Sequence, residues 1–255
     1  MLSRFMQDLV RLGIGPGDTV MMHSSFKSLG VKMNPDDFFD CFMQVLGENG
    51  TLLLPALSYE SVSKDQPVFD RQNTPSCVGF LPEYFRTNVS DVIRSFHPTH
   101  SVCAKGRLAE WFVSDHEKDN TPVGENSPIA KLPKVGGKIL FLGCDPDHNT
   151  ALHGVEEAAD VPYVFDRTRQ TEFVLKDGSF ELHRKMLCHD FVKKDHWLRQ
   201  RYGRIIDLLP KKKRRFGKVL QADCVLLDAA AVWQIGTEKM KEDPYYFVER
   251  IDEVL

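Results

Sequence analysis

The chain begins with apolar residues at the spacing of an amphipathic helix. The apolar face of this first helix is formed by Leu2, Phe5, Leu9 and Leu12. Glycines at positions 13, 15 and 17 follow and predict the end of the helix. The next run, Thr19-Val20-Met21-Met22-His23, is almost wholly apolar and predicts a buried strand that leads into a polar loop.

A second helix and strand follow directly. Asn34-Pro35-Asp36-Asp37 combines a capping amide, a proline in the first turn and two acids at the positive end of a helix. The apolar face of this helix comprises Phe38, Phe39, Phe42, Met43 and Leu46. Gly47 is expected to end the helix, and Thr51–Leu54 is expected to form the second strand.

The same alternation continues to the end of the chain. It predicts helices over Leu81–Arg86, Leu108–Val113, Ala151–Ala159 (capped by Thr150), His189–Arg201 and Tyr245–Leu255. It predicts strands over Asp91–Ser95, Lys138–Gly143, Lys218–Gln221 and Val225–Leu227, and a hairpin of Thr171–Leu175 with Phe180–Arg184. Such alternation is typical of an α/β sandwich with a mixed, partly parallel central sheet. Without repeats or a low-complexity linker, we expect residues 1–255 to form one domain.

Composition narrows the class of protein. Of the 255 residues, 42% are hydrophobic and 27% are charged, which excludes a disordered or fibrous chain. The net charge of -3 argues against a nucleic-acid binder. Six dispersed cysteines without a C-x-x-C pair, no signal peptide and no long apolar run predict a soluble, cytoplasmic protein that does not enter membranes. Acids outnumber bases over residues 1–160, which suits a cationic small molecule as well as a solvated surface.

Histidines stand near the ends of the predicted strands. His23 closes the first strand, His97 and His100 belong to Phe96-His97-Pro98-Thr99-His100-Ser101, and His153 begins a helix. Strand ends of an α/β sheet meet at one edge, where ligands commonly bind. His153 has acids three and four residues later, at Glu156 and Glu157, so a carboxylate can orient its ring. This spacing fits a general base and an exposed helical ion pair equally well.

Metal binding is an alternative use of these histidines. His97-x-x-His100 resembles a ligand pair, and His23 or His153 could complete a zinc site for a hydrolase. Pro98 prevents the helix that usually presents such a pair. The basic run Lys211–Arg215 could hold phosphates, although such runs are more often solvated loops.

Several segments together resemble the aminoglycoside 3-N-acetyltransferase family, also called the antibiotic N-acetyltransferase family. In the first part of the chain they are Val20–Ser25 with Ser28-Leu29-Gly30, Gly50–Pro55, Phe69-Asp70, Thr74-Pro75-Ser76, Gly79 and Leu81-Pro82-Glu83. They continue with Arg94–Val102, Thr121-Pro122-x-Gly124, Ser127-Pro128, Gly137–Gly143 and Thr150-x-Leu152-His153-x-x-Glu156. The segments occur in the family's order and span most of the chain.

The resemblance implies an α/β acyltransferase that uses acetyl-CoA, without a metal, to acetylate an amino group of an aminoglycoside or similar amino sugar, and thereby a role in antibiotic resistance. By this likeness His153 is the general base and Glu156 orients it. The positions expected to bind coenzyme A are Ser24, Ser25, Ser28, Leu29, Gly30, Val31 and Ser101. Asp70 and Glu157 are the expected contacts of the amine acceptor.

Elementary chemistry agrees with this implication. An alkylammonium ion must lose a proton before it attacks a thioester, so transfer needs a base and no protein nucleophile. A covalent route through Cys144 or Ser24 is unnecessary. Acetylation of a nucleotide-linked amino sugar and zinc-dependent hydrolysis stay open as alternatives. The acceptor, the oligomeric state and the roles of His189 and Asp190 are not predicted.

Overall fold

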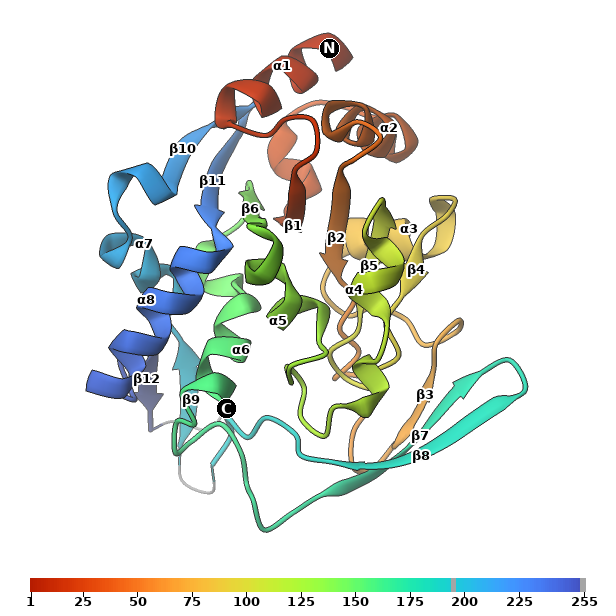
Figure 1. Ribbon diagram of the computed structural model, residues 1–255, viewed down its shortest axis with the longest axis vertical. Helices are drawn as coiled ribbons and strands as arrows, with labels where there is room; N and C mark the ends of the chain where they lie inside the picture. Colours follow the sequence, from red (N-terminus) through yellow and green to blue (C-terminus); the bar gives the residue numbers. More distant parts are fainter. Residues whose placement is uncertain (194–195, 253–255) are drawn as a thin grey trace.

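The structure, a computed structural model, describes residues 1–193 and 196–252 and contains a mixed seven-stranded sheet between helices (Figure 1). The strands of this sheet, in spatial order, are β10 (Arg214–Val219), β11 (Ala222–Asp228), β6 (Lys138–Leu142), β1 (Thr19–Ser24), β2 (Thr51–Pro55), β5 (Val102–Gly106) and β4 (Ile93–Arg94). β1 pairs in parallel with β2 and β6, and the other neighbours are antiparallel. The prediction of a mixed, partly parallel sheet is therefore confirmed.

Helices cover both faces of this sheet because its central strands bury side chains on both sides. One face packs against α1 (Leu2–Leu12), α2 (Pro35–Leu46) and α3 (Phe80–Asn88). The other face packs against α4 (Ala109–Val113), α5 (Pro128–Lys131), α6 (Ala151–Ala158), α7 (Ile205–Leu208) and α8 (Ala229–Glu242). Along β1 the alternation is visible in adjacent residues: Val20 and Met22 face the first layer, and Met21 faces the second.

Two smaller sheets and several short helices flank this core. β3 (Val68–Asp70), β7 (Thr171–Asp177) and β8 (Phe180–Met186) form one sheet, and β9 (Trp197–Gln200) pairs with β12 (Val248–Ile251). The short 3-10 helices are η1 (Phe26–Leu29), η2 (His116–Lys118), η3 (Leu132–Val135), η4 (Pro146–His148), η5 (Tyr202–Arg204) and η6 (Lys211–Lys213). No helix within the described ranges is both long and apolar enough to cross a membrane.

Where the predicted caps and turns are strong, the elements occur as predicted. Gly13 ends α1 in the left-handed conformation at φ 108°, and the Asn34 side chain accepts a hydrogen bond from the Asp36 amide at the start of α2. β7 and β8 form the predicted hairpin, with Gly178 in its turn at φ 58°. The predicted strand at Lys218–Gln221 is displaced, since β10 ends at Val219 and Leu220 turns the chain with φ 54°.

Two predicted helices are wrong. The described part of His189–Arg201 is extended and contains β9, while residues 194–195 lie outside the described residues. Within Tyr245–Leu255 the chain forms β12, and residues 253–255 also lie outside the described residues. Each strand supplies the backbone partner of the other, so pairing distant in sequence decided these conformations. α8 was not predicted, although Asp228 caps it by accepting a hydrogen bond from the Ala231 amide.

Candidate active site

A cavity of about 1110 Å³ opens at the carboxyl ends of the parallel strands. Its lining includes Ser24 and Ser25 at the end of β1, Pro55 at the end of β2 and Cys144 just after β6. The lining also includes residues of α6, β9, short 3-10 helices and loops, and it carries His23, His100, His148, His153 and His189. The predicted gathering of histidines at one sheet edge is confirmed for three positions, His23, His100 and His153.

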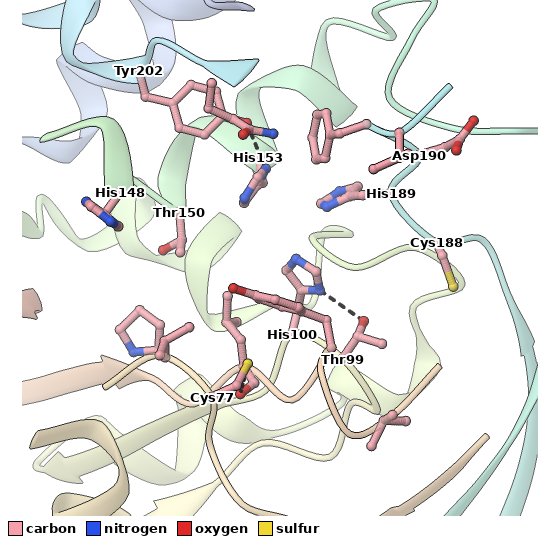
Figure 2. A pocket seen from close by; sticks show the side chains of 18 of the residues that line it. Cys77, Thr99, His100, His148, Thr150, His153, Cys188, His189, Asp190 and Tyr202 are labelled. Atoms are coloured by element: carbon pink, nitrogen blue, oxygen red, sulfur yellow. Dashed lines mark hydrogen bonds between the residues drawn. The ribbon is translucent and has the colours of Figure 1, made fainter. Parts of the chain in front are cut away.

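His153 is held from one side. It lies in the first turn of α6, with its side chain 15% exposed, and its Nδ1 is 3.3 Å from Glu156 Oε2 and 2.9 Å from the Tyr202 hydroxyl oxygen. Tyr202 and Tyr163 donate hydrogen bonds to the two oxygens of Glu156, at 2.7 and 2.9 Å, and Glu156 is fully buried. Figure 2 shows Tyr202 against one edge of the His153 ring, while the other edge faces the cavity.

These contacts fix the proton on His153. A carboxylate only accepts, so the Tyr202 hydroxyl hydrogen is used by Glu156, and the Tyr202 oxygen is left to accept from His153 Nδ1–H. Burial, together with the adjacent Glu156, raises the pKa of Tyr202 well above its ordinary value and keeps this hydrogen in place. His153 Nε2 therefore carries the free lone pair. Neither tyrosine was predicted, because nothing in the local pattern distinguishes them from core residues.

Glu157 contacts His189 and a backbone amide. Its Oε1 lies 2.7 Å from His189 Nε2 and accepts a 2.8 Å hydrogen bond from the Val123 amide. Burial raises the pKa of Glu157 to about 7 and lowers the pKa of His189, so the pair favours uncharged forms. The carboxylate supports His189, whereas an acceptor contact by Glu157 stays a prediction. His189 itself comes from the segment that was expected to be helical.

The His97-x-x-His100 pair does not act as two ligands side by side. His97 Nδ1 accepts the amides of Thr99 and His100, so it fastens its own loop. His100 instead enters the cavity with Nδ1 2.9 Å from the Thr99 hydroxyl oxygen. Among the described residues, the group suited to hold a metal ion is His100, His153 and His189, with one ligand atom of each within 4.8 Å of the others.

His23 and Thr150 differ from the simplest prediction. Thr150 does not cap α6 with its side chain, because its hydroxyl lies 3.5 Å from His23 Nε2, and Asn149 accepts the Ala151 amide instead. The His23 ring stacks on Phe141, and burial lowers its pKa to about 3. A neutral His23 therefore packs at the base of the cavity.

Of the seven residues predicted to bind coenzyme A, two are among those that line the cavity in the described structure. In the described structure Ser24 and Ser25 line the cavity, and the Ser24 hydroxyl is buried without a hydrogen-bond partner. The Ser28 hydroxyl donates to the Gly143 carbonyl and Leu29 is buried, so both brace the loop from behind. Gly30, which follows Leu29, has a left-handed backbone conformation (φ 68°) and lies next to the Gln221 side chain. Val31 is 37% exposed.

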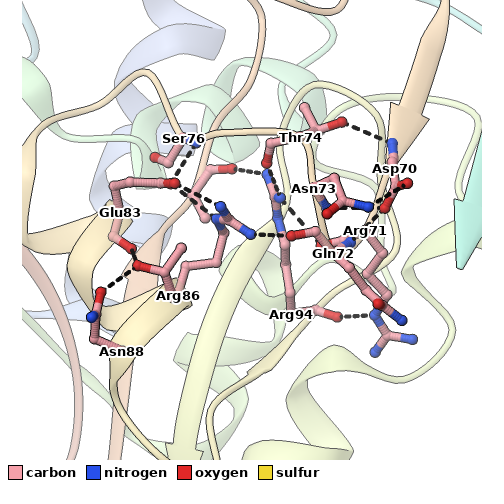
Figure 3. Close-up of polar contacts among 12 residues, drawn as sticks. Asp70, Arg71, Gln72, Asn73, Thr74, Ser76, Glu83, Arg86, Asn88 and Arg94 are labelled. Atoms are coloured by element: carbon pink, nitrogen blue, oxygen red, sulfur yellow. Dashed lines mark hydrogen bonds and ion pairs between the residues drawn. The ribbon is translucent and has the colours of Figure 1, made fainter. Parts of the chain in front are cut away.

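A polar network that includes Arg94 and Thr74 connects Ser101 with Asp70, and Figure 3 shows its part around Arg94, Thr74 and Asp70. The fully buried Ser101 hydroxyl accepts from Arg94 Nε and donates to the Ala56 carbonyl. Asp70 accepts the Gln72 and Asn73 amides and the Asn73 side-chain amide, which lowers the pKa of its carboxyl. Roles for Ser101 in coenzyme binding and for Asp70 in acceptor binding stay predictions.

Comparison with known proteins identifies the family. A family model described as aminoglycoside 3-N-acetyltransferase matches residues 21–241. Aminoglycoside N(3)-acetyltransferase VIII of Streptomyces fradiae is 29% identical over 92% of this chain and 90% of its own length. Aminoglycoside N(3)-acetyltransferase IV of a Salmonella species is 32% identical over 94% of this chain and 87% of its own length.

Solved structures show the same fold. AAC-IIIb in a binary complex with CoASH superimposes with a TM-score of 0.80 at 28% identity, covering 95% of this chain and 96% of that chain. A variant of AAC(3)-IVa in complex with a gentamicin gives a TM-score of 0.79 at 26% identity, covering 96% and 90%. The chain therefore belongs to the aminoglycoside 3-N-acetyltransferase family, and the predicted family, fold and acyltransferase class are confirmed.

Proposed function

We propose that this member of the aminoglycoside 3-N-acetyltransferase family transfers an acetyl group from acetyl-CoA directly to an amino group of an aminoglycoside or related amino sugar. His153 acts as the general base and Glu156 positions it. The observation that carries the proposal is the asymmetry of His153, whose Nδ1 is held by Tyr202 and Glu156 while Nε2 is free at a cavity wall. A neutral imidazole held in this way accepts a proton at the required atom.

The reaction follows from this geometry. The substrate ammonium ion first releases one proton to solvent. As the neutral amine nitrogen then attacks the thioester carbonyl carbon, His153 Nε2 takes a second proton from it. The tetrahedral intermediate then breaks its carbon–sulfur bond and releases the coenzyme A thiolate, which takes the proton back from His153. Burial raises the pKa of the Cys144 thiol to about 12, so this cavity residue is a poor nucleophile, which favours direct transfer.

Both substrates can be accommodated in one cavity. The complex of AAC-IIIb with CoASH supports the same coenzyme here, and the unpartnered Ser24 hydroxyl can bind it. Lys64 and Arg169 also line the cavity and are suited to its phosphates. The complex of AAC(3)-IVa with a gentamicin supports an aminoglycoside acceptor. Asp147, Asp166 and Asp190 line the cavity and could bind its amines, in exchange for their ion pairs with Arg201, Arg169 and Lys193.

Acetylation of a nucleotide-linked amino sugar has less support. Its diphosphate would need additional cations, and the basic run Lys211–Arg215 forms η6 and the start of β10, away from the residues that line the cavity. Within that run, Lys213 pairs with Asp228 at 2.7 Å. Charged residues on the edge strand β10 are typical of protection against edge-to-edge association.

An acceptor screen tests the proposal. The purified chain is incubated with acetyl-CoA and a panel of aminoglycosides, free amino sugars and nucleotide-linked amino sugars in the presence of a chelator, and released thiol is measured. We expect thiol release with aminoglycosides or free amino sugars and intersecting initial-rate patterns, as for a ternary complex. If none of the amines in the panel causes thiol release, the proposed substrate class is contradicted. Ping-pong kinetics or an acetylated Cys144 would contradict direct transfer.

A further inference from the structure

Three imidazole rings from separate parts of the chain meet at the cavity wall. His100 comes from the loop before β5, His153 from α6 and His189 from the extended segment after β8 (Figure 2). One ligand atom from each ring lies within 4.8 Å of the other two. Acetyl transfer uses only His153 of the three, so the convergence of the other two rings has no part in that reaction.

Each ring is held through one nitrogen by an oxygen. His100 Nδ1 is 2.9 Å from the Thr99 hydroxyl, and His153 Nδ1 is 2.9 Å from the Tyr202 hydroxyl. His189 Nε2 is 2.7 Å from Glu157 Oε1, and its Nδ1 is buried without a hydrogen-bond partner in the described structure. Histidines that bind metals are oriented in this way, with one nitrogen on an oxygen acceptor and the other on the ion.

Charge and protonation also suit a divalent cation. In each ring the nitrogen that is not held by an oxygen can offer its lone pair to a metal ion. Glu156 and Glu157 stand directly behind His153 and His189, and a divalent ion on these rings would favour the charged form of both carboxyl groups. Three neutral imidazoles with an open fourth position match the ligand set of zinc.

The separation of the rings requires a small closure. Zinc–nitrogen bonds of about 2.0–2.1 Å in a tetrahedron place the nitrogens about 3.3 Å apart. The ligand nitrogens are up to 4.8 Å apart, so they must approach one another by at most about 1.5 Å. Rotation of the side chains can provide this movement. The open position would then face the cavity that all three residues line.

We propose that His100, His153 and His189 form a zinc-binding site at the wall of the active-site cavity. The zinc ion takes the Nε2 lone pair of His153, which acetyl transfer needs for the substrate proton. Zinc binding and acetyl transfer therefore exclude each other, and zinc inhibits the enzyme. The zinc site is inferred only from the positions of its three histidines, whereas the inhibition also rests on the proposed function.

Direct binding measurements test the site. The full chain, freed of metal by a chelator and dialysed, is titrated with zinc chloride by calorimetry and with cobalt chloride by visible spectroscopy. We expect one equivalent of zinc and the intense visible bands of tetrahedral cobalt. His189→Ala should weaken zinc binding more than about 100-fold, and Glu157→Gln about 10- to 100-fold, because the latter removes only the carboxylate behind a ligand.

Two histidine variants serve as controls. His148→Ala alters a histidine that lines the same cavity outside the group of three, and His183→Ala alters an exposed histidine on β8. Both should bind zinc as the unaltered chain does. Less than one equivalent of zinc, an octahedral cobalt spectrum of the unaltered chain, or equal affinity in His189→Ala would overturn the site, and the first two results need no variant to fold.

Activity separates this inference from the proposed function. Each protein's rate of thiol release with added zinc is divided by its own rate in chelator. The unaltered chain should lose its activity at one equivalent of zinc, and Glu157→Gln should need about 10- to 100-fold more zinc. If the chain transfers acetyl groups in chelator but does not bind zinc, only the zinc site is overturned. If it binds zinc but does not transfer acetyl groups in chelator, only the proposed function is overturned. Full activity with zinc bound would overturn their mutual exclusion.

Discussion

The protein holds two groups of buried histidines that differ in how their nitrogens are used. The interior pair, His97 and His116, stack with ring centroids 4.6 Å apart behind the cavity. His116 accepts from the Ser95 hydroxyl at Nδ1 and donates to the Pro122 carbonyl at Nε2, at 2.9 and 3.3 Å. His97 accepts the Thr99 and His100 amides at Nδ1, and its Nε2 is buried without a hydrogen-bond partner in the described structure. In the cavity group, His100, His153 and His189 each have only one nitrogen fastened by an oxygen.

This difference separates structural from chemical roles better than burial does. Burial lowers the pKa in both groups, to about 3 for His116 and well below the ordinary value for His189. His116, with both nitrogens bonded to the protein, has no lone pair or hydrogen left for a substrate, and the unbonded nitrogen of His97 belongs to a ring that does not line the cavity. A ring fastened at one nitrogen is oriented and still reactive at the other. Substitutions in both groups test whether this distinction holds.

The largest effect is expected at His153. His153→Ala removes the proposed general base from the cavity group. It should lower kcat at least about 100-fold, while the KM for acetyl-CoA changes little. Steady-state thiol release measures both constants. His183→Ala, on the exposed surface of β8, is the matched control and should leave kcat unchanged. Near-normal turnover in His153→Ala would place His153 with the interior pair as a structural residue.

The interior pair should respond in stability instead. His116→Phe keeps a ring of similar size but leaves the Pro122 carbonyl without its donor and the Ser95 hydroxyl without its acceptor. The loss of these two bonds should lower the free energy of unfolding at pH 7 by about 2–4 kcal/mol. Denaturant unfolding measures this change. A kcat of the folded variant reduced as strongly as in His153→Ala would break the comparison.

The pH dependence of that variant sharpens the same test. Burial, with a smaller contribution from Lys131, lowers the folded-state pKa of His116 from 6.5 to about 3. Its neutral form contributes fully above pH 6.5, and this contribution is lost as the pH falls toward 3, because the unfolded chain takes up the proton first. The stability gap between the unaltered chain and His116→Phe should therefore narrow by about 1.4 kcal/mol per pH unit below pH 6. A constant gap from pH 7 to 5 would contradict a buried neutral His116.

Much of the fold was predictable because local signals agreed with tertiary packing. The Asn34 cap and the Gly13 stop defined two helices, and continuous apolar runs gave β1, β2 and β6. The strands β9 and β12 were not predictable from local pattern, because each depends on a partner about fifty positions away in the sequence. Their apolar residues occur in short clusters that fit a helix equally well.

The site was predictable only where its parts lie close in sequence. Glu156 and Glu157 follow His153 by three and four residues on α6, so helical spacing predicted that one of these carboxylates contacts the ring, and the resemblance to the family selected Glu156. Tyr202 and His189 reach the same place from 49 and 36 residues further along the chain, through a segment whose conformation was wrongly predicted. The resemblance to the family supplied the roles of matched positions, and it could not supply those of residues outside its motifs.

The smallest effect is expected at the group that fastens the base. Glu156→Gln keeps the size of the side chain but replaces one acceptor oxygen by an NH2 group, so only one of Tyr202 and Tyr163 can still donate to it. The orientation of His153 is then weakened while its Nε2 remains able to accept a proton. We expect kcat to fall about 10-fold, less than in His153→Ala, with the KM for acetyl-CoA unchanged. Tyr163→Phe, which removes the bond on the oxygen remote from His153, is the matched comparison and should cost less still. A loss in Glu156→Gln as large as in His153→Ala would mean that the carboxylate does more than position the ring, and an unchanged kcat would mean that Tyr202 alone fastens His153.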